Sequence, residues 1–524
     1  MKKLITTALL TSIIIISASA SIKVTGRVTD INGKGIAYVP VSDGHQFVYT
    51  DKNGKYELKG DFDQDLVFVS TPNGYEPVDR LDGNRPKFWV NIGNHDTIAN
   101  FTLKEINEKK PVAFLAVADL QISDRAGDRD RLKNLYVPDL NKSIDSLRNI
   151  GLDPFILTLG DQTCDFYWSE TGYCLPEFNK EFTVNCPVYL SMGNHDNDPW
   201  KPGDLGGSST FRAINGPAYY SFNRGGAHFV VLDNMVYKNY DALPDKPGKR
   251  DYTTALYDDQ LDWLKNDLKS IKDKNTPIFV AMHGILLTYP VGEDEKIDNI
   301  FRMEEGGEAL ANILKPFNKV NVMTGHAHNN HYQHTADFKI REYNVGGANG
   351  TWWPARLRPN QPNIELCRDG SPWGYMIWNL SADKPSHVYK GFDLPVSHQM
   401  RVYDLNTLTI NDETLTKDYL PGDPKNKNRV LANIWAYEDG CKVKFYENGK
   451  ELKVKRIRAQ DPYQFNKYLI PLKESGVDLW SPLLPEHTAH MFEAYAETSD
   501  APITVEFKDL SGNTFTKTLE RKIK

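Results

Sequence analysis

The residues best suited to chemistry are two histidines, His326 and His328, which follow Gly325 with one residue between them. The mostly apolar stretch before them, residues 320–323, is typical of a buried strand that ends at the glycine. Two imidazoles at this spacing can reach one inorganic site, and imidazole nitrogen is a common ligand for Zn, Fe, Ni and Mn. The pattern indicates a metal site if other strand ends supply matching ligands.

Four predicted strands upstream also end in residues that bind metals. These strands cover residues 112–118, 155–159, 187–192 and 277–282. In chain order, the first strand is followed by Asp119 and Gln121, the second by Gly160 and Asp161, the third by Gly193–Asn194–His195–Asp196, and the fourth by His283 and Gly284. Because ligands gather beyond the carboxyl ends of strands in α/β sheets, we expect all these side chains to meet at one edge.

The segments between the strands predict helices. Apolar residues at helical spacing favour helices over 139–149 and 258–271, and residues 305–317 form a third candidate. Further strands are expected at 227–232 and 375–380. Buried strands that alternate with helices predict an α/β domain with helices on both faces of its sheets.

Short β-type runs separated by turn signals flank this α/β region on both sides. Before it, residues 22–105 alternate such runs with turns, and Asn53–Gly54 is a strong hairpin signal. The charged segment 104–110 indicates a linker. From Pro395 onward strand-like runs recur, with Asn448–Gly449 as another hairpin signal, and predict a second β-sandwich.

The N-terminus has the pattern of a signal peptide. Lys2 and Lys3 precede an apolar run over residues 4–16, and Ala18–Ser19–Ala20 supplies small residues for cleavage. The run is too short to span a bilayer comfortably, and no cysteine lies near the cut to carry a lipid anchor. We therefore expect a periplasmic or secreted protein that begins at Ser21 and has no transmembrane segment after signal cleavage.

Composition is that of a soluble globular protein and argues against nucleic acid as a partner. A chain of 524 residues is expected to form two or three domains, and its net charge of −7 offers no basic surface. The five cysteines include no CxxC pair, which excludes a cysteine-based zinc ribbon. In an oxidising compartment some of them could pair, and Cys164 and Cys174 are close in sequence.

Taken together, the five ligand blocks resemble those of the calcineurin-like metallophosphoesterase family, which run D-x-H, G-D, G-N-H-D/E, H and G-H-x-H. The resemblance covers residues 112–392 and keeps the order and approximate spacing of every block. It implies an α/β fold, a central four-layer α/β/β/α sandwich, here flanked by an N-terminal and a C-terminal β-sandwich domain.

The N-terminal region has a resemblance of its own. Residues 24–26 and 50–56 are similar to a transthyretin-like or carboxypeptidase-regulatory-like β-sandwich. The chain as a whole therefore resembles an exported bacterial type with three domains. We expect a signal peptide over 1–20, a β-sandwich domain over 21–108, a phosphoesterase catalytic domain over 109–393 and a β-rich domain over 394–524.

The family resemblance implies a role for each block residue. The ligands of one divalent metal ion are matched by Asp119, Gln121, Asp161 and His328. Those of a second are matched by Asp161, Asn194, His283 and His326, so that Asp161 bridges the two. His195 matches the residue that contacts the scissile phosphate, and we expect Asp196 to orient it.

One block departs from the family pattern, because Gln121 stands where a histidine is usual. An amide oxygen can bind a hard cation, but it is a weaker donor than imidazole. The departure favours Mn or Mg over Zn at the first position, or a lower occupancy.

A pair of metals predicts hydrolysis of a phosphate ester. Two cations about 3.5–4 Å apart can clamp the attacking and leaving oxygens, and a hydroxide that bridges them is a strong nucleophile at neutral pH. His195 is the natural proton donor for the leaving alkoxide. The cofactors expected are two divalent ions, Mn, Zn, Fe or Mg. The substrate expected is a phosphorylated small molecule, nucleotide or lipid headgroup, either a phosphodiester or a phosphomonoester.

Two tryptophans and one asparagine are candidates for contacts with the rest of the substrate. Trp352 and Trp353 follow the glycine-rich loop 346–350 and predict a stacking platform, although packing against loops explains any single one as well. Asn194 is the third candidate.

A second class of function stays open. In it the chain is a metal- or glycan-binding envelope protein with weakened or lost catalysis, and Gln121 marks the loss of one metal. Retention of His195 and of all ligands of the second metal favours the enzyme. The oligomeric state is not predicted.

Overall fold

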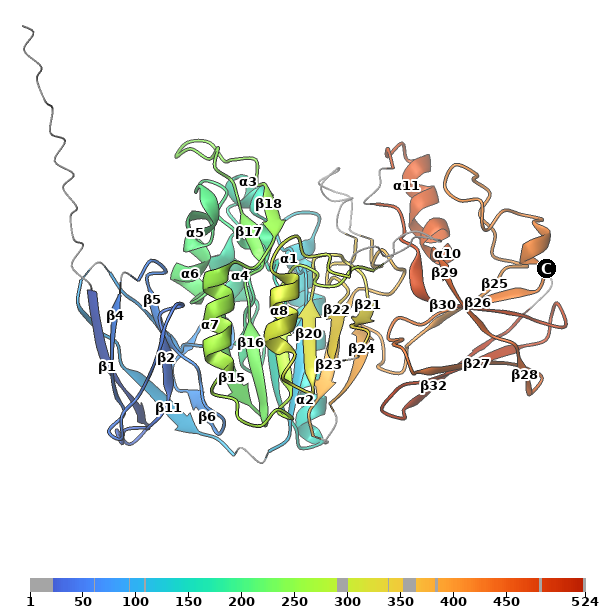
Figure 1. Cartoon of the computed structure of the whole chain (residues 1–524). Coiled ribbons are helices and arrows are strands. Elements are labelled where there is room, and N and C mark those ends of the chain that lie inside the picture. Colours follow the sequence, from blue (N-terminus) through green and yellow to red (C-terminus); the bar gives the residue numbers. More distant parts are fainter. Residues whose placement is uncertain are drawn as a thin grey trace, which may run out of the picture.

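A computed structural model describes residues 22–60, 62–93, 95–107, 110–289, 300–337, 339–351, 364–381, 385–479 and 483–521. The predicted signal peptide over 1–20, Trp352 and Trp353 lie outside the described residues. Three parts follow one another along the chain, a β-rich N-terminal part, a central α/β part and a β-rich C-terminal part (Figure 1).

The N-terminal part is built from two sheets and one short strand pair. The five-stranded sheet contains β1 (Ile22–Asp30), β4 (Lys55–Gly60), β6 (Tyr75–Pro77), β10 (Thr97–Ile98) and β11 (Phe101–Glu105). The four-stranded sheet contains β2 (Pro40–Ser42), β3 (Phe47–Tyr49), β5 (Leu66–Val69) and β9 (Trp89–Asn91), and β7 (Arg80–Leu81) pairs with β8 (Arg85–Pro86). Strand β4 alternates exposed and buried residues, which is the pattern of a strand that covers a core with one face.

The central part contains two larger sheets. The first has the order β14 (Val188–Tyr189), β13 (Asp153–Thr158), β12 (Val112–Val117), β23 (Gly374–Asn379) and β24 (Ser386–Gly391). The second has the order β15 (Tyr220–Arg224), β16 (Ala227–Val231), β19 (Ile278–Ala281), β20 (Val320–Thr324), β22 (Ile340–Asn344) and β21 (His331–His334). The inner strands pair in parallel and are buried along their length, so their carboxyl ends share one edge.

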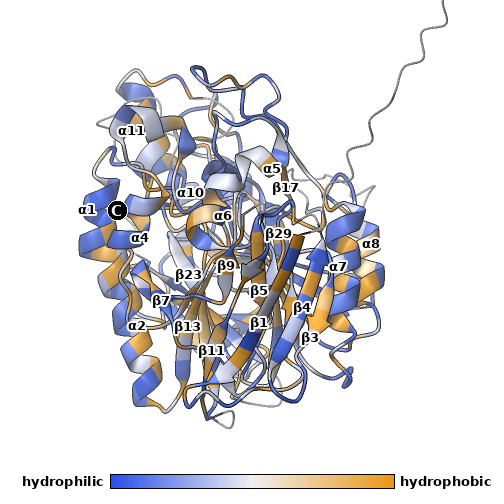
Figure 2. Ribbon diagram, turned by 90° about the vertical axis from the view of Figure 1, so that its left-hand side faces the viewer, coloured by the Kyte–Doolittle hydropathy of each residue, from blue (hydrophilic) through white to orange (hydrophobic). Residues whose placement is uncertain are grey.

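Helices cover the outer faces of the two sheets and complete the four layers that the family resemblance implies. α7 (Asp258–Leu268) and α8 (Gly307–Leu314) lie on one side, and α1 (Asp128–Arg131), α2 (Val137–Asn149) and α4 (Leu175–Glu181) on the other (Figure 2). The α/β/β/α architecture is therefore confirmed. The shorter helices are α3 (Trp168–Thr171), α5 (Gly203–Gly207) and α6 (Ser209–Asn215).

Aromatic rings fill the space between the two central sheets. Phe114 of β12 stacks on Phe155 at 5.4 Å and meets Phe229 and Phe279 of the facing sheet edge-on, at 5.5 and 5.2 Å between ring centres. Such pairs contribute about 0.5–1.5 kcal/mol each beyond the burial of their surface. The sheets are thereby held as a rigid base for the loops at their carboxyl edge.

The C-terminal part is a sandwich of two antiparallel sheets. One has the order β25 (Arg401–Asp404), β26 (Arg429–Asn433), β30 (Thr488–Tyr495) and β29 (Lys455–Ala459). The other has the order β28 (Lys450–Leu452), β27 (Lys442–Glu447), β31 (Ile503–Lys508) and β32 (Thr514–Leu519), and α10 (Pro462–Gln464) and α11 (Ile470–Glu474) lie in the loops.

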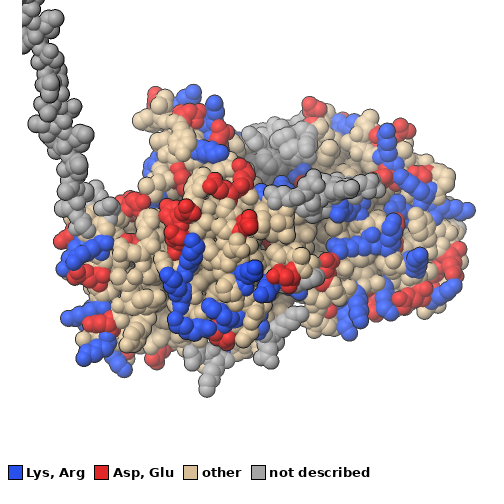
Figure 3. All heavy atoms as spheres, viewed as in Figure 1, with Lys and Arg blue, Asp and Glu red and all other residues tan. Residues whose placement is uncertain are grey.

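Three further observations bear on the expectations from sequence. No disulfide joins any of the five cysteines, all of which lie in the described part of the chain. Among the described residues no helix has both the length and the apolar character needed to cross a bilayer. On the face seen in Figure 3, Lys and Arg are interspersed with Asp and Glu.

Candidate metal centre

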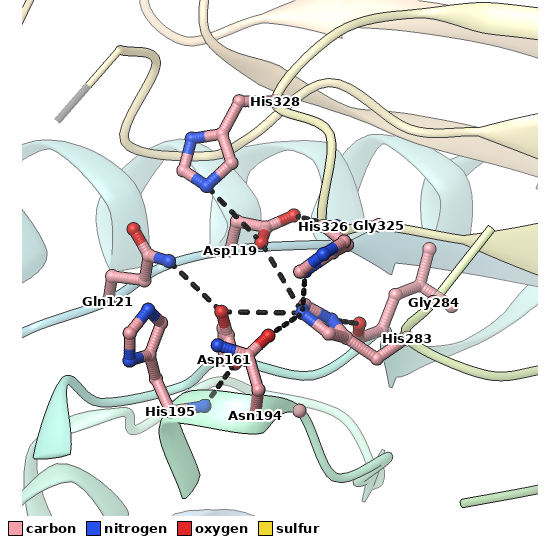
Figure 4. A network of polar contacts seen from close by, with 12 residues as sticks. Asp119, Gln121, Asp161, Asn194, His195, His283, Gly284, Gly325, His326 and His328 are labelled. Atoms are coloured by element: carbon pink, nitrogen blue, oxygen red, sulfur yellow. Dashed lines mark hydrogen bonds and ion pairs between the residues drawn. The ribbon is translucent and has the colours of Figure 1, made fainter. Parts of the chain in front are cut away.

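The predicted ligand blocks meet at the carboxyl edge of the two central sheets. Their loops follow β12, β13, β14, β19 and β20, and the side chains point toward one another across a small space (Figure 4). The structure brings together all the residues predicted to surround the metals, Asp119, Gln121, Asp161, Asn194, His195, His283, His326 and His328. Each is buried except His326, which is half-buried.

His283 lies at the centre of this cluster. Its Nε2 is 3.2 Å from Asn194 Oδ1, 3.2 Å from His326 Nδ1 and 3.3 Å from Asp161 Oδ2. Its Nδ1 is 2.7 Å from the carbonyl oxygen of Leu159, which accepts the Nδ1 proton. The Nε2 lone pair is therefore turned to the other donors, which is the tautomer that a metal ligand requires.

Asp119 and His328 form the neighbouring side of the cluster. His328 Nδ1 donates to the carbonyl oxygen of Gly350 at 2.6 Å, and its Nε2 is 3.4 Å from Asp119 Oδ1. The other oxygen of Asp119 accepts the backbone N–H of His326 at 2.9 Å, but Oδ1 is buried without a hydrogen-bond partner. A buried carboxylate oxygen with no such partner is costly, and a cation would satisfy it.

The donor set fits divalent cations. It combines carboxylate oxygens of Asp119 and Asp161 with an amide oxygen and imidazole nitrogens, a mixture that suits Mn, Fe or Zn and, at its oxygen-rich side, Mg. Asp119, Asp161 and His283 each place a donor atom within 4.8 Å of the other two. Asp161 is the one that also touches groups on both sides of the cluster, as bridging requires.

The charges in the cluster favour positive charge at its centre. Burial lowers the pKa of His283, but the carboxylates of Asp161 and Asp119 and the Leu159 carbonyl together outweigh burial and raise this pKa to about 10. Burial likewise disfavours an ionised Asp161, and the imidazoles of His283 and His195 nevertheless hold its pKa well below the ordinary value. For His326, burial and then His283 lower the pKa to about 3, so this imidazole stays neutral and able to bind a cation.

The backbone holds five of these residues in the left-handed region that side chains normally avoid. The φ angles are 53° at Asp119, 46° at Gln121, 55° at Asp161, 70° at His326 and 53° at His328. Such conformations cost of order 1–3 kcal/mol each and persist only where the surrounding structure enforces them. Four of the five form two pairs, Asp119 with Gln121 and His326 with His328, each separated by one residue. The same backbone strain therefore occurs in the first and in the last ligand block.

The glycines of the blocks allow close approach to the ligands. A Cβ atom at Gly193 would lie 2.2 Å from Asp161 Oδ1, and one at Gly160 would lie 2.5 Å from His283 Nδ1. One at Gly325 would lie 2.8 Å from Asp119 Oδ2. A larger residue at any of these positions would therefore collide with a ligand, and Gly160 also has a φ of 90°, which favours glycine.

Gln121 is placed as predicted but presents the other end of its amide. Its Nε2 donates to Asp161 Oδ2 at 3.0 Å, and its Oε1 accepts from Asn349 Nδ2 at 3.2 Å. In this arrangement Gln121 is a hydrogen-bond donor to the bridging carboxylate and its oxygen points away from the centre. Asn349 Oδ1 is buried without a partner, and turning both amides by 180° would satisfy it and aim Gln121 Oε1 at the centre.

The predicted role of Asp196 is wrong. Its carboxylate accepts backbone N–H groups of Asp161, Gln162 and Gly193 at 2.8–3.0 Å, whereas the His195 ring pairs with Asp165. Burial and the nearby Asp161 raise its pKa to about 8. Asp196 thus holds the turn that carries Asp161, because its side-chain carboxylate accepts three backbone N–H groups there.

Asp165 orients His195 instead. His195 Nδ1 and Asp165 Oδ1 are 2.7 Å apart, and the second oxygen of Asp165 accepts Nε–H of Arg250 at 2.6 Å. Cys164 lies near enough to Asp165 and His195 for the three to hold a cation, but the guanidinium of Arg250 already supplies the positive charge. The signal for Asp165 in the sequence is its position four residues after Asp161.

A hairpin supplies two residues that sequence reasoning missed. β17 (Met235–Tyr237) pairs with β18 (Tyr252–Thr254), and Arg250 lies two residues before Tyr252, the first residue of β18. The hydroxyl of Tyr252 is 3.4 Å from Nε2 of His326. This hairpin thus contacts Asp165, the partner of His195, through Arg250 and the predicted ligand His326 through Tyr252. Neither residue belongs to a recognisable sequence motif.

Aromatic residues near the site divide into two kinds. Phe166 lies beside His195, with 5.2 Å between ring centres, whereas Tyr167 and Trp168 are buried in the packing of their loop. The predicted platform residues Trp352 and Trp353 lie outside the described residues, so the platform stays a prediction.

The site makes a specific prediction for Asp165→Asn. Removing the charge that holds His195 should lower kcat on a phosphate ester with a poor leaving group, such as phenyl phosphate, more than on a nitrophenyl ester. The loss should be smaller than the 10²–10⁴-fold that general acid catalysis typically contributes, because His195 itself remains. Steady-state kinetics on both esters, with metal content measured alongside, would check this.

Asp196→Asn is the matched comparison for that variant. Because Asp196 holds the backbone of Asp161, we expect this change to reduce bound metal, whereas Asp165→Asn should keep it. Parent-like turnover of phenyl phosphate by Asp165→Asn would contradict the assignment of Asp165.

Comparison with known proteins gives three matches to family models, in chain order. Residues 22–106 match the N terminal of Calcineurin-like phosphoesterase, residues 112–330 match Calcineurin-like phosphoesterase, and residues 342–515 match the C terminal of Calcineurin-like phosphoesterase. The middle match contains every predicted ligand of the two metals.

Individual relatives are distant. Purple acid phosphatase 13 of Arabidopsis thaliana is 33% identical over 117 residues, and the match spans 20% of this chain and 18% of that protein. Among solved structures, purple acid phosphatase PPD1 of yellow lupin (Lupinus luteus) has 11% identity and a TM-score of 0.34, with 71% of this chain and 67% of that one covered. GAP50, the anchor in the inner membrane complex of Plasmodium, has 14% identity and a TM-score of 0.31, with 54% and 84% covered.

Proposed function

We propose that this chain, which belongs to the calcineurin-like phosphoesterase family, hydrolyses a phosphomonoester or phosphodiester with the help of two divalent metal ions. The observation that carries the proposal is the convergence of Asp161, Asn194, His283 and His326 around one point, with His195 beside it. The substrate class proposed is a phosphorylated small molecule, nucleotide or lipid headgroup.

The residues present would hold one cation between Asp119, Asp161 and His328, with Gln121 after rotation of its amide. They would hold the other between Asp161, Asn194, His283 and His326. When bound, such cations supply Lewis-acid activation of water and neutralise charge on the phosphate. The metals proposed are Mn, Zn, Fe or Mg, because the donor set mixes oxygen with imidazole nitrogen.

His195 is the proposed proton donor to the leaving group. Asp165 accepts its Nδ1 proton, so Nε2 is the ring nitrogen that faces away from Asp165 and is available to the substrate. Burial opposes a charged His195, but Asp161 and Asp165 outweigh it and raise the pKa of His195, which favours the protonated form of a general acid. The backbone N–H of His195 donates to Asp161 Oδ1 at 2.8 Å and fixes the ring relative to the metal ligands.

Removal and return of metal test the proposal. Chelation should abolish hydrolysis of nitrophenyl phosphate and of bis-nitrophenyl phosphate, and reloading with Mn²⁺ or Zn²⁺ should restore it. The ratio of the two rates would separate a monoesterase from a diesterase. Failure of the metal-replete protein to hydrolyse either ester would overturn the proposed activity.

The alternative, a metal- or glycan-binding envelope protein with weakened or lost catalysis, is favoured by one observation. Gln121 turns its amide oxygen to Asn349, which leaves the first metal position one donor short. Metal counting on the purified protein separates the two functions, since fewer than two ions per chain together with no turnover would support the alternative.

We also propose that the mature protein is exported to the periplasm or beyond. The support is the basic, apolar and small-residue pattern of residues 1–20. Fractionation of the native host, with N-terminal sequencing of the mature chain, tests this. A chain that keeps Met1 in the cytoplasm would contradict it.

A further inference from the structure

The loop that carries the last two predicted ligands continues into two buried asparagines. Asn329 and Asn330 follow His328 directly and are 0% and 1% exposed. Asn330 bonds within the central part, donating to Ser371 Oγ at 2.8 Å and accepting the backbone N–H of Gly346 at 3.1 Å. Asn329 differs, because its side chain reaches the C-terminal part of the chain.

Glu486 is the residue that Asn329 reaches. It lies just before β30 of the C-terminal sandwich and is 9% exposed. Asn329 Nδ2 donates to Glu486 Oε2 at 2.7 Å and contacts the hydroxyl of Tyr289 at 3.2 Å. The C-terminal part adjoins the central part on the side of β21 and β24, so this contact crosses between them (Figure 1).

Arg368 closes a ring of bonds between the same groups. Its backbone N–H donates to the carbonyl oxygen of His328 at 2.9 Å, and its own carbonyl oxygen accepts the backbone N–H of Glu486 at 2.8 Å. Its guanidinium also forms an ion pair with the Glu486 carboxylate. Glu486 is therefore joined to the ligand loop twice, through the side chain of Asn329 and through Arg368 to the backbone of His328.

The segment around Arg368 is itself anchored to the C-terminal sheet. Asp369 Oδ2 is 3.0 Å from Nε2 of His490 in β30, and its carbonyl oxygen accepts from Asn433 Nδ2 at 2.9 Å. Residues 368 and 369 thus lie between the ligand loop and β30, with polar bonds to both. The bonds of Asp369 to β26 and β30 therefore hold Arg368 in place against the C-terminal sheet.

We infer that Glu486 is a positioning residue for the metal centre and that the C-terminal part of the chain takes part in metal binding through it. The inference rests on the metal centre proposed above. His328 adopts a φ of 53°, a conformation that its surroundings must enforce. Arg368 binds the carbonyl oxygen of His328, and Glu486 binds the side chain of the next residue, Asn329. We call these contacts of Arg368, Glu486 and Asn329 the clamp. Releasing the clamp lets the loop relax and turns Nε2 of His328 away from Asp119.

The test is the Mn²⁺ affinity of the chelated full-length chain, measured from the EPR signal of free Mn²⁺, for the parent, Glu486→Gln and Glu493→Gln. Glu493 is a matched control, because it lies in β30, is 8% exposed and pairs with Arg429 at 2.8 Å without touching the ligand loop. Loss of a group that supports a ligand typically costs about 10–100-fold in metal affinity. We expect a loss of that size at one of two sites in Glu486→Gln and none in Glu493→Gln, while thermal unfolding shifts alike in both.

A second variant covers the case in which Glu486→Gln does not fold. Asn329→Ala removes the side-chain contact and leaves the ion pair of Arg368 with Glu486, and we expect it to lower the same affinity. Parent-like Mn²⁺ affinity in a folded Glu486→Gln or in Asn329→Ala would overturn the inference. Mn²⁺ binding by a parent that hydrolyses no ester would overturn the proposed activity and leave the clamp standing.

Discussion

Asp161→Asn is expected to remove both metal ions and, with them, all measurable phosphoesterase activity. Asp161 Oδ1 accepts the His195 backbone N–H at 2.8 Å, and Oδ2 lies 3.3 Å from His283 Nε2 and 3.0 Å from Gln121 Nε2. An asparagine offers one oxygen and no charge, so one of these directions would receive an NH₂ group. A group that only supports a ligand already costs about 10–100-fold in affinity, and the shared ligand should cost more than 100-fold.

A second buried aspartate of the central part provides the control. Asp139 is 8% exposed and pairs with Lys390 Nζ at 2.6 Å in the first turn of α2, outside the ligand loops. Asp139→Asn should lower stability, because it leaves a buried ammonium unpaired, and should keep two metals. Elemental analysis after dialysis would decide, and an Asp161→Asn protein that retains both ions would show that Asp161 does not bridge them.

His195→Ala is expected to lower kcat about 10²–10⁴-fold with both metals retained, the range of a lost general acid. The reason is that His195 contributes its backbone N–H to Asp161 but its ring to Asp165, so truncating the ring leaves the ligands in place. The drop should be largest for alkyl or phenyl esters, which need a proton on departure, and smallest for nitrophenyl esters. Kinetics across such a series measure it directly.

Another buried histidine–aspartate pair serves as the control for that series. His228 Nε2 is 2.7 Å from Asp267 Oδ2, and both residues are buried at the opposite end of the strand from the ligand loops. His228→Ala should destabilise the chain and leave the dependence on leaving group unchanged. A uniform drop across all esters in His195→Ala, or loss of metal from it, would mean that His195 acts through the fold and not as an acid.

The ligand blocks were predictable from sequence because each is local. A buried strand, a glycine and a donor residue fall within a few positions, and parallel strands bring their carboxyl ends together whatever the loops do. For this reason the convergence of Asp161, His283 and His326 and the layered central fold could be expected before any coordinates. Helix 258–271 was predicted nearly as observed and ends at Leu268.

The orienting groups were not predictable, because they act across long separations. Asp196 adjoins the predicted His195 in sequence, but its carboxylate accepts backbone amides of Gln162 and Gly193. Arg250 reaches Asp165 across 85 positions. Glu486 reaches Asn329 across 157, between parts of the chain with no shared motif.

The direction of the Gln121 amide was also beyond sequence reasoning. The sequence shows that glutamine replaces histidine at position 121, but not which way its amide points. That direction depends on Asn349, which lies 228 positions away and contacts Gln121 only in the folded chain. The left-handed backbone at the ligands was not predicted either, although aspartate and histidine adopt a positive φ more often than most residues other than glycine.

Anomalous diffraction from crystals of the Mn²⁺-loaded protein tests the central claim most directly. We expect two peaks about 3.5–4 Å apart, the separation typical of two-metal sites, with the carboxylate of Asp161 between them and His283 and His328 on opposite sides. A single peak, or peaks that leave Asp161 outside the coordination of both ions, would contradict the account.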